Sequence, residues 1–327
     1  MAKIVLTGAT GFVGSFVAEK LIEDQHEVIC LIRKTSNLKW LEKLPVRLVV
    51  ASLFDPETYK DVLRNADCIL HVAGVTKAED PADYYRGNVQ TTKLLLDTVL
   101  EVNPSLSKFL LVSSQAAVGP SPDEMPIDES YPSRPLTDYG KSKLLAENLA
   151  RTYMSRLPIT IVRPPSVYGP RDTDVYIFFK NLKKGWNVQV GDTDQLVSLV
   201  YVEDLARGII QAAISERSSS KTYFLCEEPA YYWSHVAEIA AGIMNRNYRT
   251  IKIPLLAAKG VAGILEVISK LRKRPTILNR QKILEIQQPY WAISSRRAQT
   301  DFHYHTGFAL PDGIARTIEW YQHACWL

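Results

Sequence analysis

The 327-residue chain has few cysteines, little excess charge and no long apolar run. Its four cysteines lie far apart, without a CxxC pair or a metal-cluster spacing, so we expect inert thiols in a reducing compartment and no metal site. A net charge of +4 gives no support for nucleic-acid binding. No apolar run reaches the roughly 18 residues that a spanning helix needs, so integral membrane association is not expected.

A signal peptide is also not expected, because an apolar strand pattern begins at Lys3. We therefore expect a cytoplasmic protein. One segment could contact a membrane: residues 255–271 are apolar with a few charges, and the basic residues 272–274 follow. We interpret it as an amphipathic helix packed on the protein, and shallow membrane contact of 255–274 is the alternative.

Short apolar runs alternate with amphipathic ones over the first 165 residues. Strands are predicted at 3–7, 27–32, 46–51, 68–73, 108–114 and 159–164, and helices near 12–23, 56–64, 82–102 and 136–156. Continuous β-branched runs separated by helices indicate an α/β fold with a doubly wound parallel Rossmann sheet. We predict a dinucleotide-binding domain over 1–165, to which 195–226 returns, and a smaller, mostly helical substrate lobe over 166–194 and 227–327.

A glycine-rich loop joins the first predicted strand to the first helix, in KIVLTGATGFVGSFVAEKLI. Gly8, Gly11 and Gly14 would allow a sharp turn, a close approach to a pyrophosphate and tight helix packing. The helix N-terminus that follows offers N–H groups and a partial positive charge to phosphates. The loop therefore predicts a dinucleotide site. Its other expected members are Thr10, Phe12 and Val13.

The residues after the second strand bear on the choice between NAD(H) and NADP(H). An NAD-selective site usually has an acidic residue here for the ribose 2′-hydroxyl. This chain has Arg33, Lys34 and Ser36 instead. Because a guanidinium suits a 2′-phosphate, we favour NADP(H) over NAD(H). The alternative is that Arg33 stacks on the adenine or is solvated.

A tyrosine and a lysine lie one helical turn apart in DYGKSKLLAE. On a helix Tyr139 and Lys143 share a face. An unperturbed tyrosine has a pKa of about 10, and a nearby ammonium favours the phenolate. We therefore expect Lys143 to lower the pKa of Tyr139. The pair alone does not decide, because an exposed tyrosine and lysine one turn apart are common.

The chain resembles the extended short-chain dehydrogenase/reductase superfamily, the NAD-dependent epimerases and dehydratases. The glycine loop, LLVSSQAAVG, DYGKSK, RPPSVYGP and LVYVEDLARG carry the resemblance, which covers nearly the whole chain. It implies a catalytic triad of Ser114, Tyr139 and Lys143. Tyr139 would exchange a proton with the substrate oxygen, Ser114 would hydrogen-bond that oxygen, and Lys143 would also reach the nicotinamide ribose.

The resemblance implies further cofactor contacts. After the fourth strand, the backbone of Ala73, Gly74 and Val75 would pass the cofactor. The loop of Pro164, Pro165 and Ser166 would lie beneath the nicotinamide. Near the adenine, where the family usually has an acidic residue, this chain departs from it with Ser52, followed by Leu53. Asn88 and His71 are expected to be structural.

Two departures from the family bear on the reaction. Dehydratases follow the active-site hydroxyl with an Asp-Glu pair, but Gln115 and Ala116 follow Ser114, so dehydration is not expected. Sugar-nucleotide epimerases often carry an arginine that clamps the diphosphate, and its position falls on Val197. The lobe offers apolar and aromatic side chains instead. They are Tyr231, Tyr232, Trp233, Val261, Ile264 and Leu265, some of which must be core.

These features favour the branch that resembles hydroxysteroid dehydrogenases and dihydroflavonol reductases. We predict an NAD(P)-dependent oxidoreductase that interconverts a secondary alcohol and a ketone or aldehyde on a small, fairly apolar substrate, contacted by Gln115 and Tyr168. One alternative is an epimerase that clamps its phosphates elsewhere, and the other is a non-catalytic, cofactor-sensing binding protein. The candidate phosphate clamps are Arg171, Arg207, Arg296 and Arg297. A homodimer through the helices near 82–102 and 136–156 is the default expectation, with a monomer as the alternative.

Overall fold

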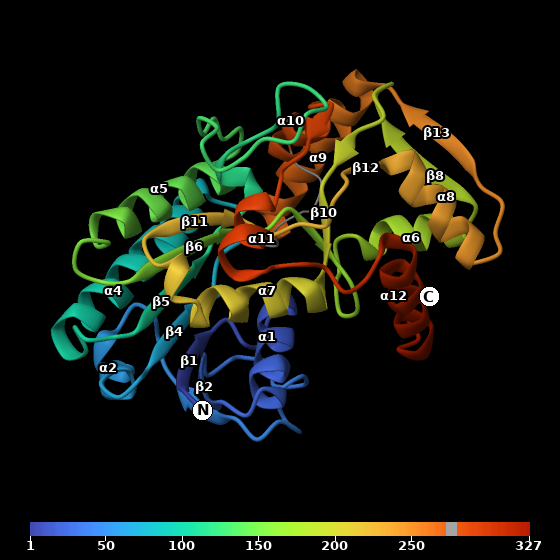
Figure 1. Ribbon diagram of the computed structural model, residues 1–327. Helices are drawn as coiled ribbons and strands as arrows, with labels where there is room; N and C mark the ends of the chain where they lie inside the picture. The colour runs from blue at the N-terminus through green and yellow to red at the C-terminus, as the bar shows by residue number, and fades with distance from the viewer. Residues whose placement is uncertain (273–279) are drawn as a thin grey trace.

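A parallel β-sheet lies at the centre of the protein (Figure 1). The structure, a computed structural model, describes residues 1–272 and 280–327, and seven strands of this part of the chain form the sheet. In order across the sheet they are β11 (Lys221–Phe224), β6 (Ile159–Arg163), β5 (Lys108–Val112), β4 (Cys68–His71), β1 (Lys3–Thr7), β2 (Glu27–Ile32) and β3 (Arg47–Val50). All neighbouring pairs are parallel. The predicted doubly wound α/β fold is confirmed.

Helices cover both faces of the sheet, because successive side chains of a strand point to opposite sides. In β1, Ile4 belongs to the apolar cluster of Phe16 and Leu205, whereas Val5 belongs to the cluster of Leu95. The first cluster holds residues of α1 (Phe12–Glu23), α7 (Val202–Ile214) and α11 (Arg296–Phe302). The second holds residues of α2 (Lys60–Leu63), α4 (Thr91–Val102) and α5 (Asp138–Thr152). These two-sided clusters explain why the strand sequences are continuously apolar.

The strand order reverses between β1 and β4. From β1 the chain continues outward to β2 and β3, and after returning to β4 it continues through β5 and β6 in the other direction. Open α/β sheets bind ligands outside the carboxyl ends of their strands at such a reversal. The glycine loop after β1 and residues 72–80 after β4 both lie at this edge.

The remaining segments form a lobe that contains more strand than the sequence predicts. Its helices are α6 (Tyr176–Lys183), α8 (Trp233–Ile243), α9 (Leu255–Arg272), α10 (Arg280–Ile286) and α12 (Leu310–His323). The described residues also form three small sheets: β7 (Ser166–Tyr168) with β10 (Leu199–Tyr201), β8 (Trp186–Val190) with β13 (Arg249–Ile253), and β9 (Leu196–Val197) between β12 (Tyr231–Tyr232) and β14 (Tyr290–Trp291). Strands of two to five residues are too short for a periodic pattern to reveal.

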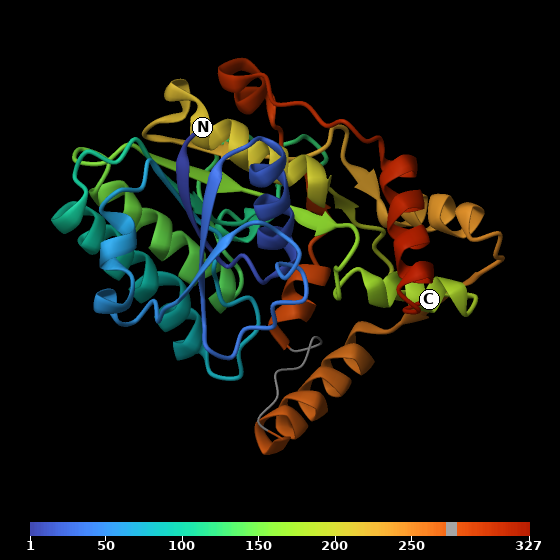
Figure 2. The ribbon, with the colours of Figure 1, turned by 90° about the horizontal axis from the view of Figure 1, so that it is seen from below.

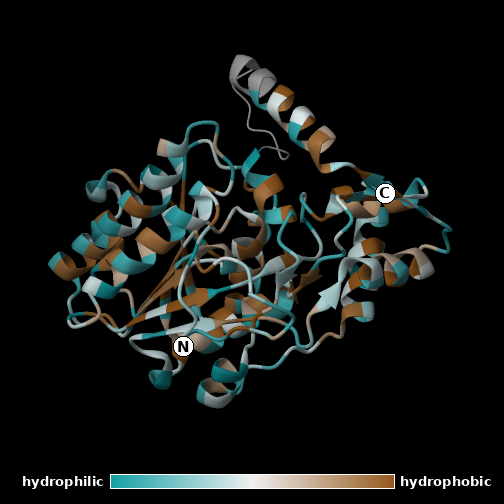
Figure 3. Ribbon diagram, turned by 90° about the horizontal axis from the view of Figure 1, so that it is seen from above, coloured by the Kyte–Doolittle hydropathy of each residue, from teal (hydrophilic) through white to brown (hydrophobic). Residues whose placement is uncertain are grey.

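Helix α9 projects from the rest of the molecule, as Figures 2 and 3 show from opposite sides. Ala258 and Ala262 pack on Ile283 of α10, while Leu256 and Ile264 are exposed. No helix among the described residues is long and apolar enough to cross a membrane. The predicted amphipathic segment 255–274 is therefore helical through Arg272, and its last two residues lie outside the described part of the chain.

The cysteines are less uniform than the sequence suggests. Cys30, Cys68 and Cys226 are buried, and burial raises the pKa of Cys30 to about 12. Such thiols stay protonated and inert at neutral pH. Cys325 is exposed near the C-terminus, so burial does not account for an inert thiol there.

Candidate active site

The glycine loop is held in a conformation that only glycine permits at two positions. Gly8 has φ +77°, and a Cβ there would lie 2.6 Å from the backbone nitrogen of Ala73. A Cβ on Gly14 would lie 2.1 Å from the carbonyl oxygen of Gly8. The first glycine therefore brings the loop against the strand β4 segment, and the second lets α1 start directly on the loop.

The N-terminus of α1 is open to an anion. Gly11 is the N-cap residue, and no side chain in the described part of the chain caps the helix. The first turn, Phe12 to Ser15, carries no acidic residue, so its N–H groups and the helix dipole face the loop without compensation. Thr10, Phe12 and Val13 are half-buried beside it. The residues present therefore fit a dinucleotide pyrophosphate.

The residues after β2 form an exposed basic turn. The Ser36 hydroxyl accepts a hydrogen bond from the Arg33 backbone nitrogen at 3.0 Å, and the Ser36 nitrogen donates to the Arg33 carbonyl at 2.9 Å. The Arg33 and Lys34 side chains are exposed. Ser36 thus shapes the turn, while the two cations stay accessible at the carboxyl edge of the sheet.

Ser52 also has a structural hydrogen-bonding role. Its nitrogen donates to Thr58 Oγ1 at 3.0 Å, and its hydroxyl accepts from the Phe54 nitrogen at 3.3 Å. Leu53 packs against the core cluster that lies under α4. The exposed Ser52 therefore stabilises the turn after β3.

The end of β4 is tied to β1 through a histidine. Thr7 Oγ1 lies 2.7 Å from His71 Nδ1 and accepts a hydrogen bond from the Ala73 nitrogen at 3.2 Å. His71 is fully buried, and burial lowers its pKa to about 3, so the imidazole is neutral. His71 is therefore a core residue, as the sequence analysis expected.

Asn88 joins the loop after β4 to α5. It lies in a helical turn, Arg86–Gln90, between α3 (Pro81–Tyr85) and α4. Its side chain accepts from the Val75 nitrogen at 2.7 Å and donates to the Val75 carbonyl at 3.1 Å and to Ser142 Oγ at 2.9 Å. A Cβ on Gly74 would lie 3.5 Å from Lys143 Nζ. The loop backbone thus passes directly beside the lysine.

The structure brings Ser114, Tyr139 and Lys143 together. Ser114 follows β5 and caps the turn Gln115–Ala117, since its hydroxyl accepts from the Ala116 nitrogen at 3.1 Å. Helix α5 packs closely on this turn, because a Cβ on Gly140 would lie 2.3 Å from the Ala116 carbonyl. As a result, the Ser114 side chain lies close enough to the Tyr139 hydroxyl to act on its pKa.

The protonation of this group differs from the sequence-based expectation. Burial raises the pKa of Tyr139 to about 12, although the Ser114 side chain opposes the rise. Lys143 is not among the groups that shift the pKa of Tyr139, and its ammonium donates to the Val112 carbonyl at 2.6 Å. Burial lowers the pKa of Lys143 to about 8, and the Glu147 carboxylate partly counteracts this. The expectation that Lys143 lowers the pKa of Tyr139 is therefore not met in this structure.

A buried ionic network behind Lys143 escaped the sequence analysis. Glu147 Oε1 accepts from Ser113 Oγ at 2.6 Å, and both carboxylate oxygens accept from Arg163, at 2.9 and 2.6 Å. Burial alone would raise the pKa of Glu147, but Arg163 and Ser113 hold it below its usual value. The sequence feature that could have revealed Glu147 is its spacing, since it follows Lys143 by one helical turn.

Gln115 is placed where a substrate contact was expected. Its nitrogen donates to the Pro164 carbonyl at 2.8 Å, which joins the turn after Ser114 to the loop after β6. Its side-chain amide nitrogen is buried and has no hydrogen-bond partner in the described structure. A buried donor in this situation favours a ligand acceptor. Pro164 and Pro165 are buried beside it, and Ser166 is exposed at the start of β7.

Tyr168 does not support the expected substrate contact. Its side chain is 2% exposed and lies in the lobe core, where its ring contacts Tyr201. A Cβ on Gly313 of α12 would lie 2.3 Å from its hydroxyl oxygen. The ring packs between strand and helix and leaves almost no surface for a ligand.

The family follows from a match that spans most of the chain. Residues 4–226, which run from β1 to just beyond β11, match the model of the NAD dependent epimerase/dehydratase family. The chain belongs to this family. The resemblance seen in the sequence motifs is thereby confirmed.

Relatives within the epimerase/dehydratase family carry different activities. The chain is 26% identical to the ceramide reductase of Caulobacter vibrioides, over 99% of this chain and 96% of that protein. It is 23% identical to the N-acetyl-alpha-D-glucosaminyl-diphospho-ditrans,octacis-undecaprenol 4-epimerase of Escherichia coli O157:H7, over 97% and 94%. UDP-glucose 4-epimerase from Thermotoga maritima shares the fold, with a TM-score of 0.81 at 19% identity over 99% of each chain.

The candidate phosphate clamps of an epimerase differ in their surroundings. Arg171 stacks 4.3 Å over the ring of Phe16 and donates to Glu19 Oε1 at 2.6 Å, so it is held against α1. Arg207 is paired with Asp204. Arg296 and Arg297 are exposed on α11. At the position of the family's arginine, Val197 is buried in β9.

The aromatic residues of the lobe are mostly anchored. Tyr231 donates to Glu227 at 2.8 Å, Tyr232 to Glu124 at 3.0 Å, and the ring of Trp233 contacts Phe178. Val261 and Ile264 are exposed on α9, and Leu265 is half-buried. Tyr231 and Trp233 therefore pack on the lobe core, whereas Tyr232, Val261 and Ile264 are exposed.

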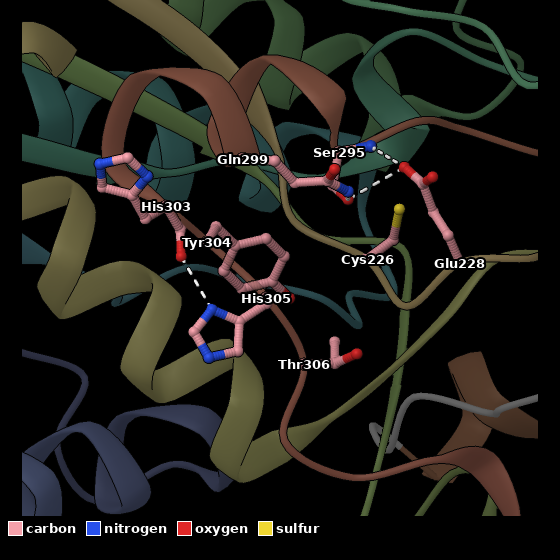
Figure 4. Close-up of a pocket in the computed structure, with 8 residues that line it drawn as sticks. All are labelled: Cys226, Glu228, Ser295, Gln299, His303, Tyr304, His305 and Thr306. Atoms are coloured by element: carbon pink, nitrogen blue, oxygen red, sulfur yellow. Dashed lines mark hydrogen bonds between the residues drawn. The ribbon is translucent and has the colours of Figure 1, made fainter.

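A further cavity of about 460 Å³ lies between α11 and the segment after β11 (Figure 4). Its lining residues, which do not include the triad, are Cys226, Glu228, Ser295, Gln299, His303, Tyr304, His305 and Thr306. Glu228 accepts from the Ser295 nitrogen at 2.7 Å, and His305 Nδ1 lies 2.9 Å from the His303 carbonyl. Among the described residues, no group of three or more histidines, cysteines or carboxylates is placed to hold a metal.

Proposed function

We propose that the protein is an NADP(H)-preferring oxidoreductase that interconverts a secondary alcohol and a ketone or aldehyde on a fairly apolar substrate. The observation that carries the proposal is the placement of Ser114, Tyr139 and the buried Lys143 together, at the sheet edge that also holds the glycine loop. These are the groups that carbonyl reduction needs in one place.

Each residue of the triad has a role that its position supports. A bound nicotinamide would supply hydride to the carbonyl carbon in reduction and would accept it from the alcohol carbon in oxidation. Tyr139 donates the proton to the carbonyl oxygen in reduction and accepts it in oxidation, and its high pKa keeps it protonated for reduction. Ser114 holds the same oxygen by a hydrogen bond. Lys143, anchored by Val112 and supported by Glu147, stands beside Gly74 to bind the ribose.

The preference for an apolar substrate rests on the residues around the triad. Gln115 and Ala116 offer no carboxylic acid for dehydration. The buried Val197 offers no charge to a diphosphate, whose desolvation needs charged partners. A relative that spans nearly the full length is a ceramide reductase, and ceramide is an apolar substrate.

The test starts with the purified protein and the two reduced dinucleotides. We expect NADPH to bind more tightly than NADH by nicotinamide fluorescence, and we expect consumption of NADPH with apolar ketones of increasing chain length. Tyr139→Phe should remove turnover while keeping NADPH binding. Tyr153→Phe is the matched control, because it loses only a hydrogen bond to Asp97 at the far end of α5.

An epimerase is the second candidate, because the relative from Escherichia coli O157:H7 also covers most of the chain. Tight co-purification of NAD, equal binding of NADH and NADPH, and turnover of a nucleotide sugar or lipid-linked sugar without net NADPH consumption would favour it. Binding of a dinucleotide without turnover of either substrate class would favour the non-catalytic protein.

A further inference from the structure

Helix α10 of the lobe contacts the helical turn that carries Tyr139. Gln281 Oε1 accepts a hydrogen bond from the Asp138 backbone nitrogen at 2.6 Å, and Gln281 Nε2 donates to Asp138 Oδ2, also at 2.6 Å. Thr137 Oγ1 donates to Glu285 Oε1 at 3.3 Å. Thr137 is the N-cap of α5 and Asp138 directly precedes Tyr139, so both contacts fall on the first turn of the helix.

The C-terminal end of α10, at Glu285, is fixed to the lobe. Gln195 Nε2 donates to the carbonyls of Glu285, at 3.1 Å, and Gln288, at 2.6 Å. Trp291 Nε1 donates to the Glu285 carbonyl at 3.1 Å. Gln195 directly precedes β9, and Trp291 belongs to β14, so α10 connects the small sheet of the lobe to the turn before Tyr139.

We propose that Gln281 and Glu285 are positioning residues for Tyr139: they hold its helical turn against the lobe and keep a negative charge near its hydroxyl. The inference rests on the proposed oxidoreductase function. Gln281 satisfies both the backbone donor and the side-chain acceptor of Asp138, a geometry that fixes the turn. Glu285 supplies the charge.

Three groups act on the pKa of the Tyr139 hydroxyl: Ser114 after β5, Glu285 of α10 and Tyr84 of α3. Lys143 lies one turn further along α5. Two further cations are already paired with carboxylates of the contact: Lys282 lies 3.1 Å from Glu285 and Lys141 lies 3.6 Å from Asp138. Glu285 and Tyr84 add to the effect of burial and raise the pKa of Tyr139 further.

The charge of Glu285 has a predictable effect on the pH profiles. A carboxylate disfavours the phenolate, so Glu285→Gln lowers the pKa of Tyr139. Reduction needs the protonated phenol and oxidation needs the phenolate. Glu285→Gln should therefore move the acid limb of oxidation toward lower pH. It should also lower the Tyr139 step of the alkaline limb of reduction, which lies above the step of Lys143. Glu238→Gln, an exposed glutamate of α8, is the matched control and should move neither limb.

The role of Gln281 is tested by measuring kcat and KM separately, because a positioning residue should affect kcat alone. Gln281→Ala should lower kcat by roughly tenfold, because a small displacement of a reacting group reduces the rate strongly, and should leave the KM for NADPH unchanged. Gln288→Ala is the control, because that side chain bonds only the Leu284 carbonyl of its own segment. A purely structural role would lower the melting temperature without moving either the pH profile or kcat.

Amide hydrogen exchange provides a readout that needs no substrate. In Gln281→Ala the Asp138 amide loses its acceptor, so it should exchange faster than in the wild-type protein and in Gln288→Ala. If NADPH binds but no ketone turns over, the oxidoreductase proposal fails while this exchange still tests the contact. Unchanged exchange at Asp138, or unmoved pH limbs in Glu285→Gln, would overturn the inference.

Discussion

The buried carboxylate of Glu147, which lies next to Lys143, allows a specific prediction about both stability and activity. Glu147 is 0% exposed and Arg163 is 3% exposed, and two hydrogen bonds join them. In Glu147→Ala the guanidinium of Arg163 keeps its charge but loses both acceptors, and Ser113 loses its acceptor as well. We expect this variant to be strongly destabilised.

The magnitude follows from the type of contact. Removing one partner of a buried ion pair reduces the free energy of unfolding by about 3–5 kcal/mol. An unfolding entropy of about 2.1 cal/mol/K per residue, over a chain of 327 residues, translates this loss into a fall in Tm of about 4–7 °C. Arg151→Ala is the control, because its side chain is 34% exposed and its contact with Glu147 contributes at most about 1 kcal/mol.

The difference in stability between the wild-type protein and Glu147→Ala should depend on pH. The pKa of Glu147 is lower in the folded protein than in the unfolded chain. Its contribution is therefore present above the unfolded pKa of about 4.3 and is lost as the pH falls through the folded pKa. Thermal melts of wild type and Glu147→Ala should differ fully at neutral pH and converge in acid.

Activity gives a second measurement of the same variant. Glu147 counteracts the effect of burial on Lys143, whose pKa is lowered to about 8. Without the carboxylate the ammonium is lost at lower pH, so NADPH-dependent activity should decline earlier on the alkaline side. Glu147→Gln, which keeps the side-chain size, should show this shift with less loss of stability.

Two results would refute the reasoning. A melting temperature of Glu147→Ala equal to that of Arg151→Ala would mean that the ion pair is not buried in solution. The double variant Glu147→Leu with Arg163→Met should regain most of the lost stability, since replacing both partners with apolar groups is often close to neutral. Failure to regain it would show that packing, and not an unpaired charge, causes the loss.

Three further predictions concern the cofactor and the reaction. Tyr139→Phe should reduce kcat by about 100-fold or more with unchanged NADPH affinity, and residual activity above a tenth would contradict the proton-transfer role. Arg33→Ala should weaken NADPH binding by roughly 10- to 100-fold and leave NADH binding unchanged, whereas equal weakening of both would argue against a 2′-phosphate contact. Gly14→Ala should abolish binding of both dinucleotides, because its Cβ would lie 2.1 Å from the Gly8 carbonyl. Gly242→Ala, with open space at its Cβ in the described structure, should bind them normally.

The central sheet was predictable because its signal is local. Strands buried on both faces are continuously apolar, and the six predicted in the first 165 residues agree with the structure within two residues at each end. The seventh strand, β11 (KTYF), begins with two polar residues, so its sequence does not indicate a buried strand. Its place at the edge of the sheet comes from pairing with β6.

The candidate site was predictable only in part. Motifs within one loop or one helical turn were visible, as in Gly8 to Gly14 and Tyr139 to Lys143. Gln281 was invisible, because it meets Asp138 across 143 residues of chain and belongs to no motif. Tyr168 failed as a substrate contact for the opposite reason: its motif was recognisable, but packing on Gly313 buries it.

The sequence by itself determined the fold class, the glycine loop and the spacing of the tyrosine and lysine, because hydrophobic periodicity and backbone permissiveness act over a few neighbouring residues. Tertiary structure alone decided the protonation of those residues. The pKa of Tyr139 depends on how deeply it is buried and on a carboxylate from α10, and that of Lys143 depends on burial and on Glu147. Desolvation and Coulomb interactions depend on distances in space, and the order of residues along the chain does not encode these distances locally.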